Sequence, residues 1–291
     1  MNASNINLRQ NAASYHIPVR QMNFGFSKQS LPQHHAGNNP LFTAVFSNLS
    51  AAIPEGERFF VRSVRLFRQQ ITDTGLQKAI AGFIGQEAFH AREHDQLNLA
   101  LAKLGLPIQQ HERIFLMAIR FLEKLPPKMQ LSATAGMEHF TAVIAEGLLR
   151  DDFVRSQLPD IILDFWMWHA IEESEHKAVA FDVYQQISGS YALRAGTMLL
   201  VSAIYWPLVL GLIFKQITQS GDVFNLRKTA YGLWVTLGPT GFFTKMTFKF
   251  LDYFRPNFHP NDHDTDALLQ YWRDRLMQDN GRLNTYLKKA A

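Results

Sequence analysis

The fold of this chain is decided by one stretch that places two imidazoles and three carboxylates within ten residues, Trp168-His169-Ala170-Ile171-Glu172-Glu173-Ser174-Glu175-His176-Lys177. At 100° per residue, His169, Glu173 and His176 fall on one narrow face of a helix. Glu172 lies on the opposite flank of that face, so Glu172 and Glu173 both suit a site there. One side of the helix thus offers carboxylate oxygen and imidazole nitrogen together, which indicates a metal site.

A second stretch carries a related unit, Phe83-Ile84-Gly85-Gln86-Glu87-Ala88-Phe89-His90-Ala91-Arg92-Glu93-His94. It contains Glu87-x-x-His90, with His94 one turn further along the same face. Bundle-type di-iron and di-manganese proteins use a helical Glu-x-x-His twice, together with one further Glu from each of two other helices. The alternative is that buried His–Glu pairs brace packed helices. A metal is favoured, because burying so many ionisable groups without a cation is costly.

Two other helical segments supply the further glutamates. From Pro54 onward, apolar residues recur at helical spacing (Phe59, Phe60, Val64, Phe67, Ile71), and Glu57 shares their face. Glu55 is the fallback, although acidic residues favour the first turn of any helix. Residues 130–150 form a second apolar helix, in which Glu138 is the predicted ligand and Glu146 is the alternative or a supporting partner.

Caps and breakers set the remaining boundaries. A helix capped by Asp73 or Thr74 runs to about Leu104, a shorter one covers residues 111–125, and the helix of the opening stretch covers residues 160–187. The predicted organisation is an irregular polar arm (1–40), a metal-binding bundle (41–190), an apolar helical hairpin (191–254), and a loop with a C-terminal helix (255–291). The arm has no apolar core that could serve as a signal peptide.

The composition narrows the chemistry. The 291 residues are 47% apolar, which is typical of a globular chain with a substantial core. With no cysteine, the chain has no disulfide, iron–sulfur cluster, thiolate zinc site or cysteine nucleophile. Histidine and carboxylate ligands suit iron, manganese or zinc. The net charge of +4 is modest. The sequence has no basic stripe interleaved with aromatic residues, so we do not predict nucleic-acid binding.

An uncharged apolar run lies between Arg194 and Lys215 and has about the length of a bilayer core. A shorter uncharged stretch covers residues 229–244. Basic residues flank both, and aromatics at Tyr205, Trp206, Tyr231 and Trp234 suit an interfacial belt. We therefore predict a hairpin that docks in or on an anionic membrane surface, in a cytoplasmic protein associated with the inner membrane. The alternative is a pair of core helices in a soluble bundle.

A loop near the C-terminus also collects His259, His263 and Asp264. These residues could bind a metal, but loop clusters of this kind are mostly solvated, so we do not predict a site there.

Taken in order, the candidate ligands are Glu57, Glu87-x-x-His90, Glu138 and His169-x-x-x-Glu173-x-x-His176. This order resembles the ferritin-like di-iron carboxylate pattern. It is also similar to the arylamine N-oxygenase type, whose last helix has an additional His where His169 stands. The segments Ile84–His90 and Glu172–Asp182 resemble a bacterial family described as predicted metal-dependent hydrolases, over about Phe42 to Tyr271. The choice of Glu173 over Glu172 rests on this resemblance.

The expectation is an all-α, ferritin-like four-helix bundle that holds two metal ions, iron first, with manganese or zinc as alternatives. The predicted function is activation of O2 to oxidise or oxygenate a hydrophobic organic substrate, which needs an electron donor. One alternative is a metal-dependent hydrolase that uses a metal-activated water. Another is a non-enzymatic, membrane-associated metal-binding protein. No catalytic residue is predicted beyond the metal ligands.

Overall fold

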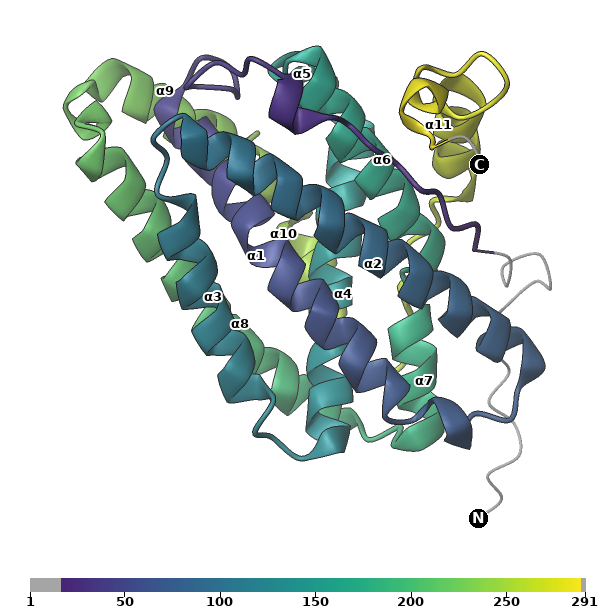
Figure 1. Cartoon of the computed structure of the whole chain (residues 1–291). Coiled ribbons are helices and arrows are strands. Elements are labelled where there is room, and N and C mark those ends of the chain that lie inside the picture. The colour runs from purple at the N-terminus through teal and green to yellow at the C-terminus, as the bar shows by residue number, and fades with distance from the viewer. Residues whose placement is uncertain (1–16, 289–291) are drawn as a thin grey trace.

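A bundle of helices forms the centre of the molecule (Figure 1), and the computed structural model describes residues 17–288 of the chain. The helices that carry the candidate ligands are α1 (Pro40–Arg65), α2 (Thr74–Lys103), α4 (Pro127–Arg150) and α6 (Asp160–His176). Helix α1 packs on α2 and α4, and α6 packs on α4 and α2. No β-strand occurs within residues 17–288, so the predicted all-α class is confirmed.

Two of these helices begin at side-chain caps. In α2 the Asp73 carboxylate accepts a hydrogen bond from the Leu76 amide at 2.6 Å, at the predicted position. Helix α1 begins at Pro40, where Asn39 accepts from the Phe42 amide at 3.0 Å. The predicted start at Pro54 was therefore wrong, and Pro54 lies inside the helix. The cap and proline at residues 39–40 are the stronger start signal, because they are followed by a long buried apolar run.

The predicted helix over residues 160–187 is broken into α6 and α7 (Val179–Ile187). At the break, the Lys177 ammonium donates to the carbonyl oxygen of His263 at 2.5 Å and to the Thr265 hydroxyl at 2.9 Å. The C-terminal segment thus holds the end of α6, directly beside His176.

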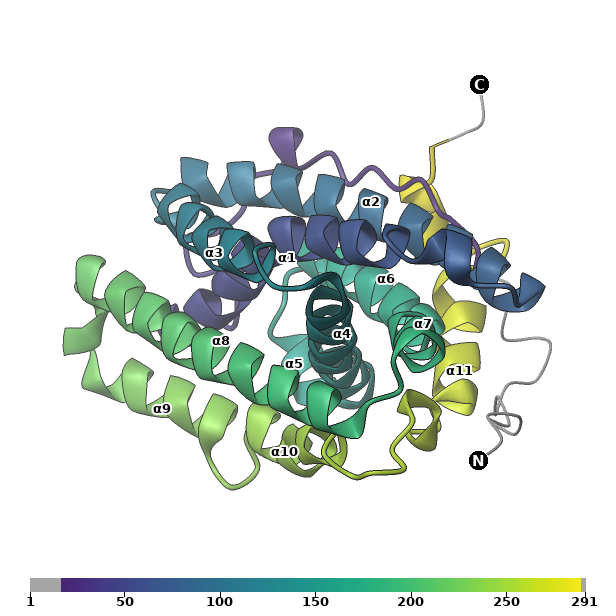
Figure 2. The same ribbon diagram turned by 90° about the horizontal axis from the view of Figure 1, so that it is seen from below.

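The outer helices are α3 (Ile108–Leu122), the short α5 (Asp152–Ser156), α8 (Tyr191–Gln219), α9 (Leu226–Leu237) and α10 (Phe242–Asp252). The predicted hairpin is therefore three helices, because α9 ends at Gly238 and α10 begins after Gly241. Helices α8, α9 and α10 lie on the side of the molecule opposite α2 (Figure 2). By length and composition, α8 could cross a membrane, and 28% of its most apolar window is buried.

Residues 17–26, here called the N-terminal strap, run alongside α2, from Gly82 next to Ile17 to Glu93, which accepts a hydrogen bond from the Phe24 amide. Gly82 permits this approach, because a methyl group there would lie 2.6 Å from the carbonyl oxygen of Ile17. The strap also pairs with the C-terminal end, where the Lys288 amide donates to the Gln21 carbonyl at 2.9 Å. The first sixteen residues of the predicted arm lie outside the described residues.

The C-terminal helix is shorter than predicted. Helix α11 covers Asp266–Leu276, and a 3-10 turn over Arg282–Tyr286 follows in place of a continuous helix to residue 289. Near Gly281 the chain folds back closely against Leu276.

Candidate metal centre

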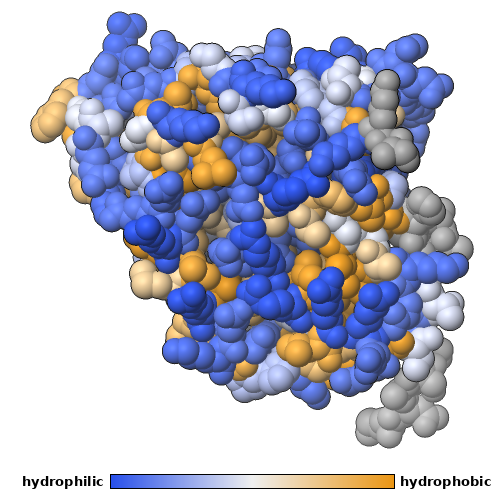
Figure 3. All heavy atoms as spheres, viewed as in Figure 1, coloured by the Kyte–Doolittle hydropathy of each residue, from blue (hydrophilic) through white to orange (hydrophobic). Residues whose placement is uncertain are grey.

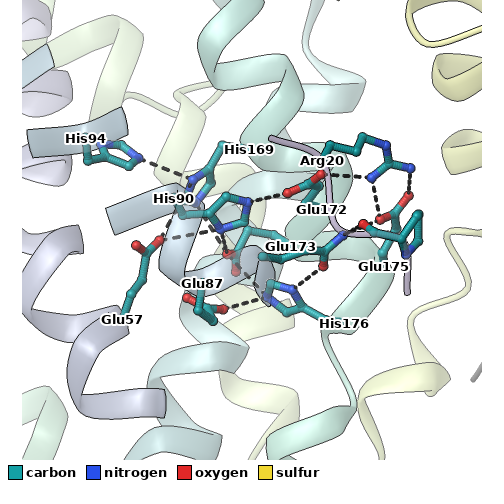
Figure 4. Close-up of polar contacts among 12 residues, drawn as sticks. Arg20, Glu57, Glu87, His90, His94, His169, Glu172, Glu173, Glu175 and His176 are labelled. Atoms are coloured by element: carbon teal, nitrogen blue, oxygen red, sulfur yellow. Dashed lines mark hydrogen bonds and ion pairs between the residues drawn. The ribbon is translucent and has the colours of Figure 1, made fainter. Parts of the chain in front are cut away.

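The structure brings all seven predicted ligands into one cluster inside the bundle. Figure 4 shows six of them around a common centre, and Glu138 lies with its Oε2 atom 3.4 Å from Nε2 of His176. All seven side chains are buried: Glu57 from α1, Glu87 and His90 from α2, Glu138 from α4, and His169, Glu173 and His176 from α6. Four packed helices therefore each contribute to one site.

The cluster divides into two groups that share Glu173. In the first group, Glu57, His90, His169 and Glu173 offer ligand atoms that all lie within 4.8 Å of one another. In the second group, Glu87, Glu173 and His176 do the same. The Oε1 atom of Glu173 is 3.4 Å from Nδ1 of His90 and 3.3 Å from Nε2 of His176. Glu173 is therefore the carboxylate that could serve an ion in each group.

His176 Nε2 and Glu87 Oε1 lie 3.0 Å apart as an ion pair, but most ligand atoms that face the centre have no hydrogen-bond partner among the described residues. They are both carboxylate oxygens of Glu57, Glu87 and Glu138, one oxygen of Glu173, Nδ1 of His90 and Nε2 of His176. Buried polar atoms are almost always paired, because an unpaired one loses its hydration without replacement. The set therefore fits divalent cations, which pair with oxygen and imidazole nitrogen.

The pKa shifts of the buried carboxyl groups also favour a bound cation. Burial raises the pKa of the Glu57 and Glu138 carboxyl groups well above their usual range, and the neighbouring carboxylates raise it further. Burial also acts against an ionised Glu173, but the imidazoles of His176 and His90 outweigh it and hold the pKa of Glu173 well below its usual range. Without a cation, the site can ionise only part of its carboxylates.

A second set of side chains fixes the orientation of each imidazole. Glu172 Oε2 lies 2.9 Å from Nε2 of His90, so the other ring nitrogen, Nδ1, faces the centre. Gln86 Oε1 lies 2.9 Å from Nδ1 of His176, which leaves Nε2 facing the centre. His94 holds Nδ1 of His169 at 3.2 Å. Partners of this kind set the tautomer and the ring angle of metal-binding histidines.

The N-terminal strap completes this outer layer (Figure 4). The guanidinium of Arg20 donates to Glu172 at 2.9 Å and to Glu175 at 2.8 Å. Gln86 donates to the carbonyl oxygen of Pro18 at 2.9 Å. Sequence reasoning missed the roles of Arg20 and Gln86, although Gln86, a polar residue beside Glu87 in an apolar stretch, carried a local signal.

The alternative ligands are engaged elsewhere. Glu146 pairs with Arg150 at 2.7 Å and with Lys249 at 2.5 Å. Glu55 pairs with Arg58 at 2.7 Å at the edge of the bundle. The geometry thus favours Glu138, Glu57 and Glu173 over their alternatives, and their role as ligands stays a prediction.

The histidines of the C-terminal loop are also paired. His259 lies 2.9 Å from an oxygen of Asp182, and His263 lies 2.9 Å from an oxygen of Asp252. Within residues 17–288, the candidate metal groups include none of these loop residues.

An apolar cavity of about 120 Å³ reaches the centre at Glu57 and His169. Its walls come from α1, α3, α4, α6, α8 and α10, and the other polar side chains in them are Thr141 and Tyr205. For comparison, an engineered apolar cavity of about 150 Å³ in another protein contains no water and binds benzene. The cavity therefore has the size and polarity to take one ring or a short segment of an alkyl chain.

Comparison with known proteins gives one result. The model of a protein family described as "Predicted metal-dependent hydrolase" matches residues 18–264. This range contains the strap apart from Ile17, all seven candidate ligands and α8–α10. No curated protein and no solved structure matches the chain. The finer resemblance to arylamine N-oxygenases stays a prediction.

Proposed function

The chain belongs to the family of predicted metal-dependent hydrolases, and on this premise we propose that it is an enzyme that converts an apolar substrate at a dinuclear metal centre. The observation that carries the proposal is the junction of two features. The seven-residue cluster, with its unpaired donor atoms, forms one end of an apolar cavity. The substrate's reacting group would meet the centre beside Glu57 and His169, which belong to both.

Two metal ions held by this set would supply an activated water molecule for attack on an ester, amide or phosphoester, or, if the metal is iron, the electrons for O2 chemistry. Glu57, His90 and His169 would hold one ion, and Glu87, Glu138 and His176 the other, with Glu173 between them. Glu172 accepts from Nε2 of His90 and Gln86 accepts from Nδ1 of His176, so the neutral form of each ring would turn its unprotonated nitrogen towards an ion. The apolar walls bind the substrate's hydrocarbon part and exclude bulk water.

Hydrolysis is the first candidate reaction, because it is the reaction that the family description names. Thr141 and Tyr205 are the hydroxyl groups in the cavity wall that could hydrogen-bond a carbonyl oxygen or a leaving group.

Oxidation by O2 is the second candidate, and the ligand set favours it. The ligands come from bundle helices with two Glu-x-x-His units, His90 and His176 being their histidines, as in di-iron carboxylate proteins. Apart from the centre's own Glu57 and His169, no charged side chain lines the cavity among the described residues, so a hydrolytic leaving group finds no separate acid there.

The two reactions are separated by assaying one metal-loaded sample in two ways. Hydrolysis predicts release of p-nitrophenol from p-nitrophenyl esters of short fatty acids under nitrogen, without a reductant. Oxidation predicts O2 uptake that needs a reductant and increases when a hydrophobic substrate is added. Glu173→Ala should abolish whichever activity is found. If neither activity appears with iron, manganese or zinc bound, the proposed function is wrong and the non-enzymatic alternative stands.

A further inference from the structure

The segment of helices α8–α10 exposes more large apolar side chains than the rest of the described chain. Of the twenty large hydrophobic side chains exposed within residues 17–288, twelve fall between residues 191 and 251: Tyr191, Leu199, Leu210, Phe214, Phe224, Leu226, Tyr231, Leu233, Trp234, Leu237, Phe248 and Leu251. This segment is about a fifth of the chain. Exposed apolar side chains concentrated in this way mark interaction sites, because scattered single residues are the norm.

Helix α8 is apolar on two faces. Its inward residues Val201, Ile204 and Leu208 line the cavity, whereas its outward residues Leu210 and Phe214 are exposed. Its inner face packs on α1 and α4, and the Asn48 amide of α1 donates to Gln216 at 3.2 Å. Because the inner face of α8 packs on the bundle, only its outer face is free to contact an apolar surface. This arrangement suits a helix that lies on a membrane better than one that crosses it.

Basic residues outnumber acidic residues in helices α8–α10. Residues 191–252 contain six basic residues (Arg194, Lys215, Arg227, Lys228, Lys245, Lys249) and two acidic residues, Asp222 and Asp252. Arg194 is buried, and Lys245 and Lys249 pair with Asp151 and Glu146. The basic groups that remain are Lys215, Arg227 and Lys228, which all lie where α8 ends and α9 begins.

Three of the four most exposed large hydrophobic side chains within the described residues lie at the same place. Residues 214–228, here called the α8–α9 corner, include Phe214, Phe224 and Leu226, which are 63%, 85% and 76% exposed. The corner lies at the upper left of Figure 1, and hydrophobic spheres protrude at the same edge in Figure 3. Most of the face seen in Figure 3, over α2 and α3, is hydrophilic with smaller hydrophobic areas. The corner therefore combines protruding apolar groups with adjacent cations.

We propose that the α8–α9 corner and the outward face of α8 dock on the surface of an anionic lipid bilayer. Apolar side chains at such a surface insert at the boundary between headgroups and acyl chains, and Lys and Arg are attracted to anionic headgroups. The docking does not depend on the reaction at the metal centre. A consequence does rest on the proposed function: with α8 on lipid, its other face puts the cavity next to acyl chains, which makes an amphiphile with an alkyl chain the expected substrate.

The test is co-sedimentation of the full chain with vesicles of phosphatidylcholine containing about one third phosphatidylglycerol, and with vesicles of phosphatidylcholine alone. We expect binding to the anionic vesicles that weakens as salt is added. The double variant Phe214→Glu/Phe224→Glu should bind about tenfold more weakly, because it removes inserted apolar area and adds negative charge. The matched control is Leu99→Glu on α2, which changes a side chain that is 51% exposed and should bind like the wild type.

Equal vesicle binding by the wild type and the double variant would overturn the proposal, as would a wild type that binds neither vesicle. A wild-type dimer that the double variant converts to a monomer, without vesicle binding, would assign this face to a second copy of the chain and also overturn it. Metal content is measured on the same samples. Since the two phenylalanines are exposed and lie outside the ligand cluster, their variant should keep its metal, which separates a failure of docking from a failure of the proposed function.

Discussion

The metal centre and the α8–α9 corner depart from ordinary protein architecture in opposite directions. The centre buries polar atoms without hydrogen-bond partners, such as both oxygens of Glu57, whereas the corner exposes apolar side chains such as Phe224. Each departure is unfavourable for a protein alone in water, since buried polar groups lose hydration and exposed apolar groups gain unfavourable hydration. We propose that each is relieved by something outside the chain: a cation at the cluster, and an apolar surface at the corner.

The difference in burial predicts different sensitivities to substitution. A change at the centre acts on groups that cannot be solvated, so its effects should be large and should appear in metal binding. A change at the corner acts on groups already in water, so its effect on folding should be small and should appear in association. The predictions below run from the largest expected effect to the smallest.

The largest effect is expected from Glu173→Ala, because Glu173 is the carboxylate that both ligand groups share. We expect loss of both ions, measured as metal per chain by elemental analysis. Glu87→Ala should remove the ion of the second group. Glu146→Ala is the matched control, because this glutamate on α4 pairs with Arg150 and Lys249 away from the cluster. Equal metal content in the three variants would refute the ligand assignment.

Metal removal should lower stability, and by more at higher pH. Ligand binding at a hundredfold excess over Kd stabilises a protein by about 2.7 kcal/mol. Burial raises the pKa of Glu57 and Glu138 well above the usual range. In His90 the carboxylates Glu172 and Glu173 outweigh the opposing effect of burial and raise the pKa to about 9. The metal-free fold therefore binds protons that the unfolded chain has released by pH 7, and its stability falls as the pH rises towards 9.

The measurement is the melting temperature of metal-free and metal-loaded protein between pH 7 and 9. His94 and His169 do not affect this window, because burial lowers their pKa and they are neutral there both folded and unfolded. The difference between the two samples should widen with pH. A constant difference would mean that the buried carboxylates are not the groups the metal neutralises.

A smaller effect on metal affinity is expected from residues that contact the predicted ligands but do not face the centre. Glu172→Gln keeps the shape of the side chain but removes the charge that holds His90, and such partners typically change metal affinity by about 10- to 100-fold. Arg20→Gln should act in the same direction, because Arg20 anchors Glu172 from the strap. Titration with a competing chelator measures both. The account of the strap fails if Arg20→Gln leaves the affinity unchanged while Glu172→Gln lowers it.

The smallest effect is expected in the outer layer. Phe248 on α10 is 82% exposed, so Phe248→Ser should change the free energy of unfolding by no more than about 0.5 kcal/mol. Metal content should stay at the wild-type value. Phe59→Ala in α1 is the contrasting variant, because Phe59 is fully buried and its loss should cost about 3–5 kcal/mol. Chemical denaturation measures the free energy of unfolding of both variants. Similar losses of stability in the two would show that α10 is part of the core.

The centre was largely predictable from sequence because its ligands repeat at helical spacing. His169, Glu173 and His176 share a face within one helix, which needs no knowledge of the fold. The choice between Glu138 and Glu146 was not predictable in this way, since the two lie about 80° apart on one helix. Glu138 is favoured because Glu146 pairs at 2.5 Å with Lys249, more than a hundred residues later.

The supporting parts were harder to predict for the same reason. Arg20 reaches Glu172 across 152 positions of sequence, and nothing near Arg20 indicates this contact. Pro54 resembled a helix start, but the buried apolar run before it carries the helix through. Local spacing thus predicted which residues form the centre, whereas long-range packing decides what holds them in place.

The most direct test of the central claim is the metal content of the purified full-length chain after loading with iron, manganese or zinc and removal of the excess. The account predicts two ions per chain in the wild type and none in Glu173→Ala, with Glu146→Ala unchanged. Wild-type protein that retains no ion of any of the three metals would contradict it, and would leave the buried glutamates and histidines as a purely structural network.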